Sequence, residues 1–131
     1  INRLSQINRV IALLGSHAPV ESLGTSPAAL CRTRLERLRR ADALVREAAH
    51  RTGFDREVWQ FPVILVPLGT PERPDSVVLR PVDSVDGMTA RAVALPETLR
   101  EELCSRLLAE EGICAVFLDL THKPPGTIEW E

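Results

Sequence analysis

The sequence predicts an α+β fold, a two-layer sandwich with two helices on one face of a three- to four-stranded, mainly antiparallel sheet. Three observations lead to this class. Two segments carry apolar residues at every third or fourth position, short β-branched apolar runs lie between and after them, and the order is helix, two strands, a short candidate strand, helix and strand. A length of 131 residues suits one domain with one core.

Each predicted helix has one apolar stripe. The first helix runs from Pro27 or Arg32 to Arg51, and the second has Pro96 in its first turn and ends near Gly112. The stripes consist of Leu35, Leu38, Ala41, Leu44 or Val45, and Ala48 in the first helix, and of Leu99, Leu103 and Leu107 in the second. The arginines of the first helix alternate with acidic residues, which indicates a solvated face. They are Arg32, Arg34, Arg37, Arg39, Arg40 and Arg46.

The predicted strands follow from short apolar runs bounded by turn residues. Trp59–Leu68 and Ser76–Val82 are expected to pair as a hairpin, Thr89–Leu95 to form a short strand, and Ile113–Leu120 to form the last strand. The run Val63–Val66 is apolar without interruption, which is typical of a strand with little exposed surface.

Composition excludes several classes of function. The net charge of −2 gives no attraction to nucleic acid, and no apolar run is long enough to span a bilayer. Three cysteines without CxxC spacing favour a reducing compartment and argue against a zinc site, so we expect a cytoplasmic protein without metal. There is no Gly-rich phosphate loop, and His50 and His122 belong to no recognisable catalytic set. We therefore predict no catalytic residue in this chain.

The tail, Asp119–Glu131, has the residue types of a binding site. Lys123 is a compact charge suited to a phosphate, and the diproline 124–125 favours polyproline II. The carboxylate of Glu129 can accept hydrogen bonds from a base or a sugar hydroxyl. The alternative is a tail that docks Trp130 on the body for packing alone.

Two further features lie near the ends of the predicted hairpin. Gln60 comes just before the apolar run, where its amide can reach a ligand at the end of the sheet. In the loop after the second strand, Asp83, Ser84 and Asp86 can bond their own backbone or position a substrate or partner.

Four stretches resemble the glutamine-hydrolysing GMP synthetases, in the order of that family. Three are Leu38–Glu47, Trp59–Pro67 and Leu79–Ala90. The fourth is the tail, similar to the family's closing run Thr-Ser-Lys-Pro-Pro-(Ala/Gly)-Thr-Ile-Glu-Trp-Glu, with His122 where serine is usual.

The resemblance implies a role within a larger enzyme. Such an enzyme hydrolyses glutamine and passes ammonia to an ATP-pyrophosphatase domain, which adenylates XMP with ATP and Mg²⁺ before ammonia displaces AMP to give GMP. The C-terminal domain pairs two subunits as a homodimer and supplies part of the XMP site. By matching position, Gln60, Lys123 and Glu129 are expected XMP contacts, and the fragment alone is expected to be inactive. The alternative is a self-association domain that binds no nucleotide.

The resemblance also implies a division of the chain. We expect residues 1–15 to be the closing strand of an upstream repeat, residues 16–31 to be a linker or loop, and residues 32–131 to be the dimerisation domain. The run 7–14 is similar to 113–120, and some members of the family carry two repeats. Chance similarity between two apolar strands is the alternative. On this interpretation the chain is part of a longer protein.

Overall fold

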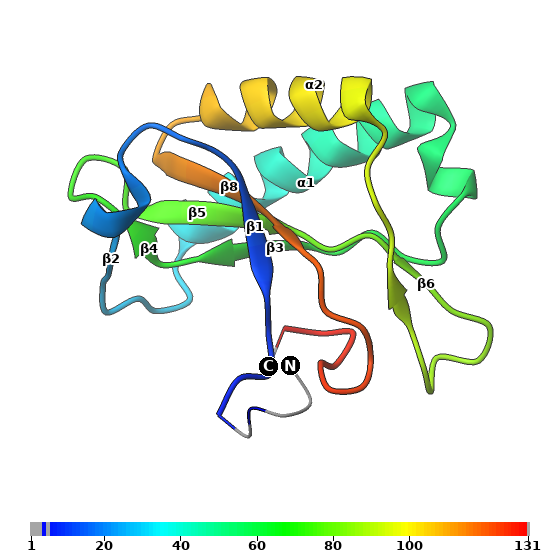
Figure 1. Cartoon of the computed structure of the whole chain (residues 1–131). Helices are drawn as coiled ribbons and strands as arrows, with labels where there is room; N and C mark the ends of the chain where they lie inside the picture. Colours follow the sequence, from blue (N-terminus) through cyan, green and yellow to red (C-terminus); the bar gives the residue numbers. More distant parts are fainter. Residues whose placement is uncertain (1–3, 5, 131) are drawn as a thin grey trace.

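The computed structural model describes residue 4 and residues 6–130, and its fold is the predicted α+β sandwich (Figure 1). Four strands form the main sheet in the order β1-β8-β5-β3, and both helices cover one face of it (Figure 1). The strands are β1 (Ile11–Ser16), β3 (Val63–Val66), β5 (Asp75–Leu79) and β8 (Ile113–Asp119). The helices are α1 (Arg32–Thr52) and α2 (Glu97–Leu108).

Both helices form where apolar side chains recur at helical spacing, and these side chains pack on the sheet. The buried residues are Ala41, Val45, Ala48 and Ala49 in α1 and Leu99, Leu103 and Leu107 in α2. Gly53 ends α1 with a φ of 79°, a left-handed conformation that glycine adopts without steric cost. Pro96 comes immediately before α2, where its missing N–H is not needed.

The sheet contains one parallel pair and two antiparallel pairs. β3 and β5 form the predicted hairpin, with Val63 opposite Leu79 and Val66 opposite Ser76. β8 lies parallel to β5, and α2 lies in the connection between them, as a parallel crossover requires. β1 pairs antiparallel with the other side of β8.

The apolar run of β3 is half-buried throughout, so the prediction that it has little exposed surface was wrong. β3 is an edge strand, and neighbours cover it on one side only. Val63 and Leu65 pack on the core under the helices, whereas Ile64 and Val66 pack on the cluster of the opposite face. Apolar contacts on both faces therefore explain the uninterrupted run.

Two short ladders and two 3₁₀ turns complete the fold. They are β2 (Gly24–Thr25) with β4 (Leu68–Gly69), β6 (Val82–Asp83) with β7 (Arg91–Ala92), η1 (Val20–Ser22) and η2 (Phe54–Arg56). β7 lies within the predicted short strand. The segment 16–31, expected as a linker or loop, contains η1 and β2 and pairs with the body of the domain through β2.

Two arginines of α1 do not belong to a solvated face, which corrects that prediction. Arg34 and Arg37 both bind Asp75, whose side chain is 2 % exposed at the start of β5. Arg34 Nη2 lies 3.0 Å from Asp75 Oδ1, and Arg37 also donates to the carbonyl of Glu111 at 3.0 Å. These contacts fix the first half of α1 against the sheet.

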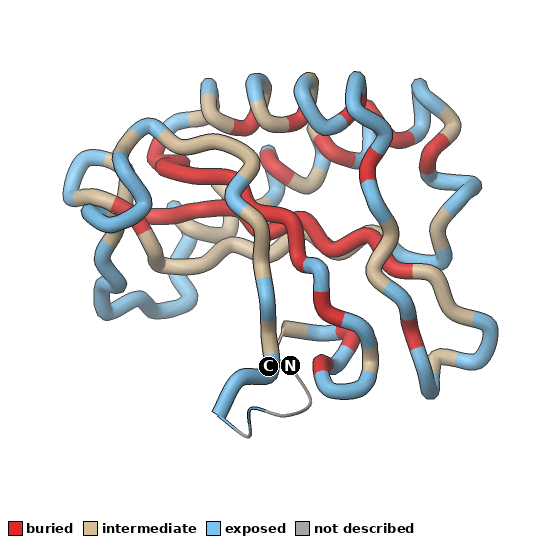
Figure 2. Tube along the Cα trace, in the orientation of Figure 1, coloured by how far each residue is buried: buried red, intermediate tan, exposed pale blue. Residues whose placement is uncertain are grey.

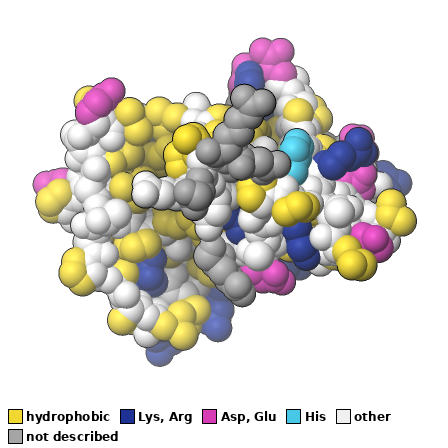
Figure 3. Space-filling model, turned by 60° about the horizontal axis from the view of Figure 1, so that its bottom comes forward, with side chains coloured by type: hydrophobic (Ala, Val, Ile, Leu, Met, Phe, Trp, Pro, Cys, Tyr) yellow, Lys and Arg dark blue, Asp and Glu magenta, His cyan; other side chains and the backbone are white. Residues whose placement is uncertain are grey.

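The two central strands, β5 and β8, are buried along their whole length (Figure 2). The main core lies between the sheet and the helices, and a smaller cluster around Val78, Ala115 and Phe117 lies on the opposite face. In Figure 3, which brings that opposite side forward, hydrophobic side chains gather on part of the visible surface.

β1 forms the second edge of the sheet and begins at Ile11, four residues after the predicted start of its apolar run. Leu13 and Val10 are 45 % and 39 % exposed. The interpretation of residues 1–15 as the closing strand of an upstream repeat stays a prediction, and residues 1–3 and 5 lie outside the part of the chain that the structure describes.

Candidate functional site

The tail after β8 folds back on the domain around Arg80. The Arg80 side chain is fully buried, and its guanidinium donates to three main-chain carbonyls of the tail. Nη1 lies 3.0 Å from Thr121 O, Nη2 lies 2.7 Å from Thr127 O, and Nε lies 3.0 Å from Ile128 O. Both ends of the segment 121–128 are therefore bound to one side chain.

Asp119 balances the charge of Arg80. Arg80 Nη1 lies 2.9 Å from Asp119 Oδ2, and neither side chain has any exposed surface. β5 and β8 run parallel, with Leu79 beside Leu118. Arg80, which follows β5, and Asp119, which ends β8, therefore meet at the carboxyl ends of these two strands. The carboxylate also accepts from Trp130 Nε1 at 2.6 Å.

The ionisation of this buried pair follows from its partners. Burial alone would raise the pKa of Asp119, but the Thr121 backbone N–H, the Trp130 indole and the Arg80 charge together hold that pKa below its usual value. Burial lowers the pKa of Arg80, and the attraction of Asp119 opposes this effect. The pair remains charged at neutral pH, because Arg titrates far above 7 and a lowered Asp pKa lies far below it.

Arg9 binds the same tail from the N-terminal side. Its guanidinium lies 3.1 Å from Asp119 Oδ2 and donates to Thr127 Oγ1 at 3.0 Å and to the carbonyl of Glu129 at 2.6 Å. It also lies 5.6 Å from the centre of the Trp130 ring, within the range of a cation–π contact. The predicted docking of Trp130 therefore occurs, together with polar contacts that packing alone does not require.

Lys123 is the only lysine in the sequence, among fifteen arginines. Its main chain exchanges two hydrogen bonds with Ala90, at 2.8 and 3.1 Å, and its Nζ donates to the carbonyl of Gly87 at 2.7 Å. An ammonium group has three donors, and among residue 4 and residues 6–130 only the Gly87 carbonyl takes one of them, which leaves two for a ligand. His122, the departure from the family's serine, accepts a hydrogen bond at Nδ1 from the Ala92 N–H at 3.0 Å.

The diproline lies in a turn, so the expected polyproline II conformation was wrong. The peptide bonds preceding Pro124 and Pro125 are both cis. The Gly126 N–H donates to the carbonyl of His122 at 3.1 Å and closes the turn. Gly126 is buried, and a Cβ there would come within 3.0 Å of both Arg9 and Thr121. Its small size allows this close approach.

The loop 84–89 is ordered by its own side chains. Ser84 Oγ accepts from the Gly87 N–H at 2.8 Å and donates to the Thr89 carbonyl at 2.5 Å, while Asp86 Oδ1 accepts from the Met88 N–H at 3.0 Å. Of the two roles open from the sequence, the structure therefore bears out backbone bonding for Ser84 and Asp86. The carbonyl that binds Lys123 belongs to this loop.

The three candidate residues are not all adjacent. Lys123 and the exposed Glu129 lie on the same tail, whose main chain Arg80 and Arg9 bind. Gln60 pairs with Val82 of β6, and the β6–β7 ladder separates it from Lys123, which bridges to Ala90. Two strands, β6 and β7, therefore lie between the main chains of Gln60 and Lys123. Gln60 lines a separate hollow with Phe61, Pro62, Asp42 and Arg46.

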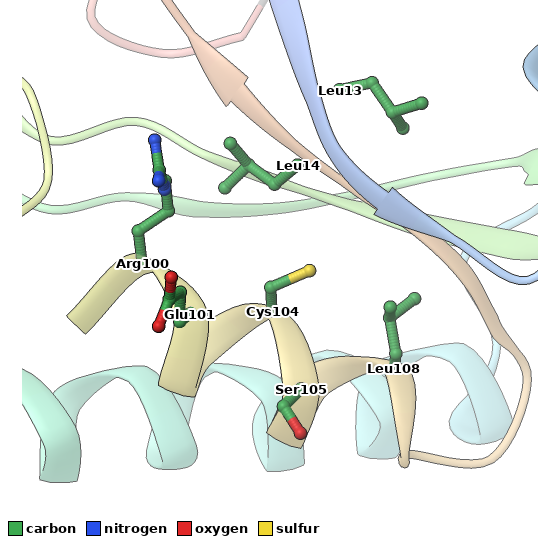
Figure 4. Close-up of a pocket in the computed structure, with 7 residues that line it drawn as sticks. All are labelled: Leu13, Leu14, Arg100, Glu101, Cys104, Ser105 and Leu108. Atoms are coloured by element: carbon green, nitrogen blue, oxygen red, sulfur yellow. The ribbon is translucent and has the colours of Figure 1, made fainter. Parts of the chain in front are cut away.

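A second hollow, of about 470 Å³, lies between β1 and α2, and Leu14, Cys104 and Leu108 contribute to its walls (Figure 4). Burial raises the pKa of the Cys104 thiol, the opposite of what an activated nucleophile needs. Its lining includes no histidine that would act as a base. The residues that line this hollow, a groove between β1 and α2, therefore include no activated nucleophile with a base beside it.

Arg9, Arg80 and Asp119 were not among the site residues predicted from the sequence. Arg80 and Asp119 each close a buried apolar run, and opposite charges at the ends of two strands are the one signal that could have indicated such a pair.

Within the described residues, no three His, Cys, Asp or Glu side chains are grouped to hold a metal ion. No helix in that part of the chain is long and apolar enough to cross a membrane.

Fold and site together define a small α+β domain built around an ordered carboxyl-terminal tail. The model of the family described as the GMP synthase C terminal domain matches residues 47–130, more than half of the chain. The chain belongs to this family.

Proteins similar to this chain are named GMP synthases. A probable glutamine-hydrolysing GMP synthase of Leptospira interrogans is 38 % identical over 131 residues, covering 99 % of this chain and 22 % of the relative. A GMP synthase of Leifsonia xyli is 44 % identical over 114 residues, covering 76 % of the chain and 22 % of the relative. A GMP synthase of a Parafrankia strain is 47 % identical over 107 residues, covering 75 % of the chain and 20 % of the relative. The chain thus spans about a fifth of the length of these relatives.

Proposed function

We propose that this chain is the C-terminal dimerisation and XMP-binding domain of a GMP synthase that aminates XMP to GMP with ATP and glutamine-derived ammonia. One observation carries the proposal: Lys123 and Glu129 project from a tail whose main chain is bound by the buried Arg80 and by Arg9. A tail that served packing alone would not need its single lysine beside an ordered loop. Family membership supports the same conclusion.

In this proposal the tail supplies charge and hydrogen bonds to the substrate. The Lys123 ammonium meets the XMP phosphate with its two remaining donors, while Gln60 and Glu129 meet phosphate, ribose or base. The separation of Gln60 from Lys123 suits an extended ligand, because a nucleotide presents its phosphate, ribose and base at different points along its length.

The remaining chemistry belongs to other parts of the enzyme. We assign ATP and Mg²⁺ to the ATP-pyrophosphatase domain. We infer that this domain is inactive alone and that it packs against the ATP-pyrophosphatase domain. Three free cysteines suit the cytoplasm, which we propose as the compartment.

Replacing Lys123 with alanine is expected to weaken XMP binding by the full-length enzyme about 10- to 100-fold. The loss of a hydrogen bond from a charged group costs about 1.5–3 kcal/mol, and about 1.4 kcal/mol is tenfold in affinity. Titration calorimetry with XMP measures the dissociation constant. Arg91→Ala is the matched control, since it removes an exposed cation from the neighbouring strand β7. Unchanged affinity in Lys123→Ala favours the alternative of a self-association domain that binds no nucleotide.

We also propose that the β1 edge of the sheet packs against a second copy of this domain. Ile7, Val10 and Leu13 are 44 %, 39 % and 45 % exposed along this edge, and the groove between β1 and α2 lies beside it (Figure 4). The second copy is the partner subunit of the proposed homodimer.

Light scattering of the 131-residue chain at several concentrations is expected to give the mass of a dimer. Leu13→Glu puts a charge into the proposed contact, so its mass is expected to fall to that of a monomer. Leu30→Glu is the control, because Leu30 is 84 % exposed and lies outside the β1 edge. A monomeric native chain, or a Leu13→Glu variant that still dimerises, contradicts the assignment of this edge as the contact of two separate chains.

A further inference from the structure

We propose that Arg80, assisted by Arg9, is a positioning residue that holds Lys123 and Glu129 in the geometry that binds XMP. This inference rests on the proposed function and deepens it, because it concerns how the site keeps its shape. Arg80 is fully buried and lies behind the tail, so its effect on a ligand passes through the main chain that it binds.

The hydrogen bonds of Arg80 fix the tail on both sides of Lys123. Thr121 O lies two residues before Lys123, while Thr127 O and Ile128 O lie on the other side, next to Glu129. One rigid guanidinium therefore sets the distance between the two segments that carry the candidate ligands. An ammonium cannot replace it, because three carbonyls in three directions suit the planar fork of donors and not a point charge.

Arg9 adds the contact nearest to Glu129. It donates to the Glu129 carbonyl at 2.6 Å and to Thr127 Oγ1 at 3.0 Å, and its side chain lies over Trp130. The carboxylate of Glu129 is left at the surface, whereas its main chain is bound. Arg9 thus orients the end of the tail that Arg80 does not reach.

The buried charge of Arg80 supports a positioning role over a purely structural one. A pair of apolar residues is often as stable as a buried ion pair, so stability alone does not demand Arg80 and Asp119. Three carbonyls of an irregular tail do demand donors, because an unpaired buried carbonyl is costly. The arrangement keeps an irregular segment in one conformation, which a preorganised ligand site requires.

The test compares Arg80→Lys and Arg9→Lys in the full-length enzyme. Titration calorimetry measures the dissociation constant for XMP, and steady-state kinetics with ammonia as the nitrogen source measure KM for ATP. We expect a tenfold or greater loss of XMP affinity in Arg80→Lys and a smaller loss in Arg9→Lys, with KM for ATP unchanged. General destabilisation would not separate the two substrates in this way.

Arg73→Lys is the matched control. Arg73 also donates to three main-chain carbonyls, those of Leu108, Glu110 and Ile113, but it binds the opposite end of β8, away from the tail. Its replacement is expected to leave XMP affinity within twofold of the native value. An equal loss of affinity in Arg73→Lys would overturn the inference, because the loss would then follow from weakened packing.

The remaining outcomes separate this inference from the proposed function. If Lys123→Ala loses XMP affinity while Arg80→Lys and Arg9→Lys keep it, Arg80 is not a positioning residue and the proposed function stands. If Lys123→Ala also keeps its affinity for XMP, both the proposed function and this inference are rejected. If Arg80→Lys does not fold, Arg9→Lys decides alone, and native XMP affinity in that variant rejects the inference.

Discussion

Replacing Asp119 with alanine is expected to lower the free energy of unfolding of the 131-residue chain by about 3–5 kcal/mol. The substitution leaves the Arg80 guanidinium buried without its counter-charge, since neither side chain has any exposed surface. It also takes the acceptor from the Trp130 indole and from the Thr121 N–H. Urea denaturation followed by circular dichroism measures the difference.

Asp83→Ala is the control for this prediction. Asp83 pairs with Arg91 at 3.6 Å, and their side chains are 47 % and 80 % exposed. Exposed ion pairs contribute about 0–1 kcal/mol, so this variant is expected to unfold within 1 kcal/mol of the native chain. A loss below about 1 kcal/mol in Asp119→Ala would show that the tail carbonyls and entering water stabilise the Arg80 charge without Asp119.

Replacing Leu103 with alanine is expected to cost about 2–5 kcal/mol of unfolding free energy. Leu103 lies at the middle of α2, has no exposed surface, and belongs to the core that the two helices form with the sheet. Truncation removes three carbon atoms from that core and leaves a cavity that the surrounding helices fill only in part. The same denaturation experiment gives the magnitude.

Leu30→Ala makes the same chemical change at a side chain that is 84 % exposed. It is expected to alter the unfolding free energy by less than about 0.5 kcal/mol, as surface substitutions do. A similar cost in both variants would mean that Leu103 is not packed between α2 and the sheet in solution. A cost for Leu103→Ala near 2 kcal/mol indicates a core that relaxes, and one near 5 kcal/mol indicates a rigid one.

The sequence was sufficient for the two helices and for the presence of the main strands, because their apolar residues form runs with the length and period of each element. α1 and α2 lie within a few residues of their predicted ends, and the hairpin of β3 and β5 was predicted correctly. Exposure of β3 was not predictable in the same way. An apolar run on an edge strand and one on a central strand look alike until the strand order is known.

The local sequence did not predict the polar contacts between residues that are far apart in the chain. Arg34 and Arg37 were assigned to a solvated face because acidic neighbours surround them, yet they bind Asp75, 41 and 38 residues away. Arg80 and Asp119 become a pair only because β5 and β8 run side by side in the same direction. The resemblance to a family supplied candidate ligands, and the structure added Arg80 and Arg9, which bind the main chain of the tail that carries two of them.

The position of Arg9 couples two parts of the chain that are far apart in sequence. It comes just before β1, whereas its partners Asp119, Thr127, Glu129 and Trp130 all belong to the end of β8 and the tail. Thermodynamic linkage is reciprocal, so a ligand that favours the tail conformation bound to Arg9 also strengthens the attachment of the N-terminal segment by the same factor. If the tail binds a ligand as proposed, binding at the tail would change the stability of the segment that leads into β1, and with it the contact proposed at the β1 edge.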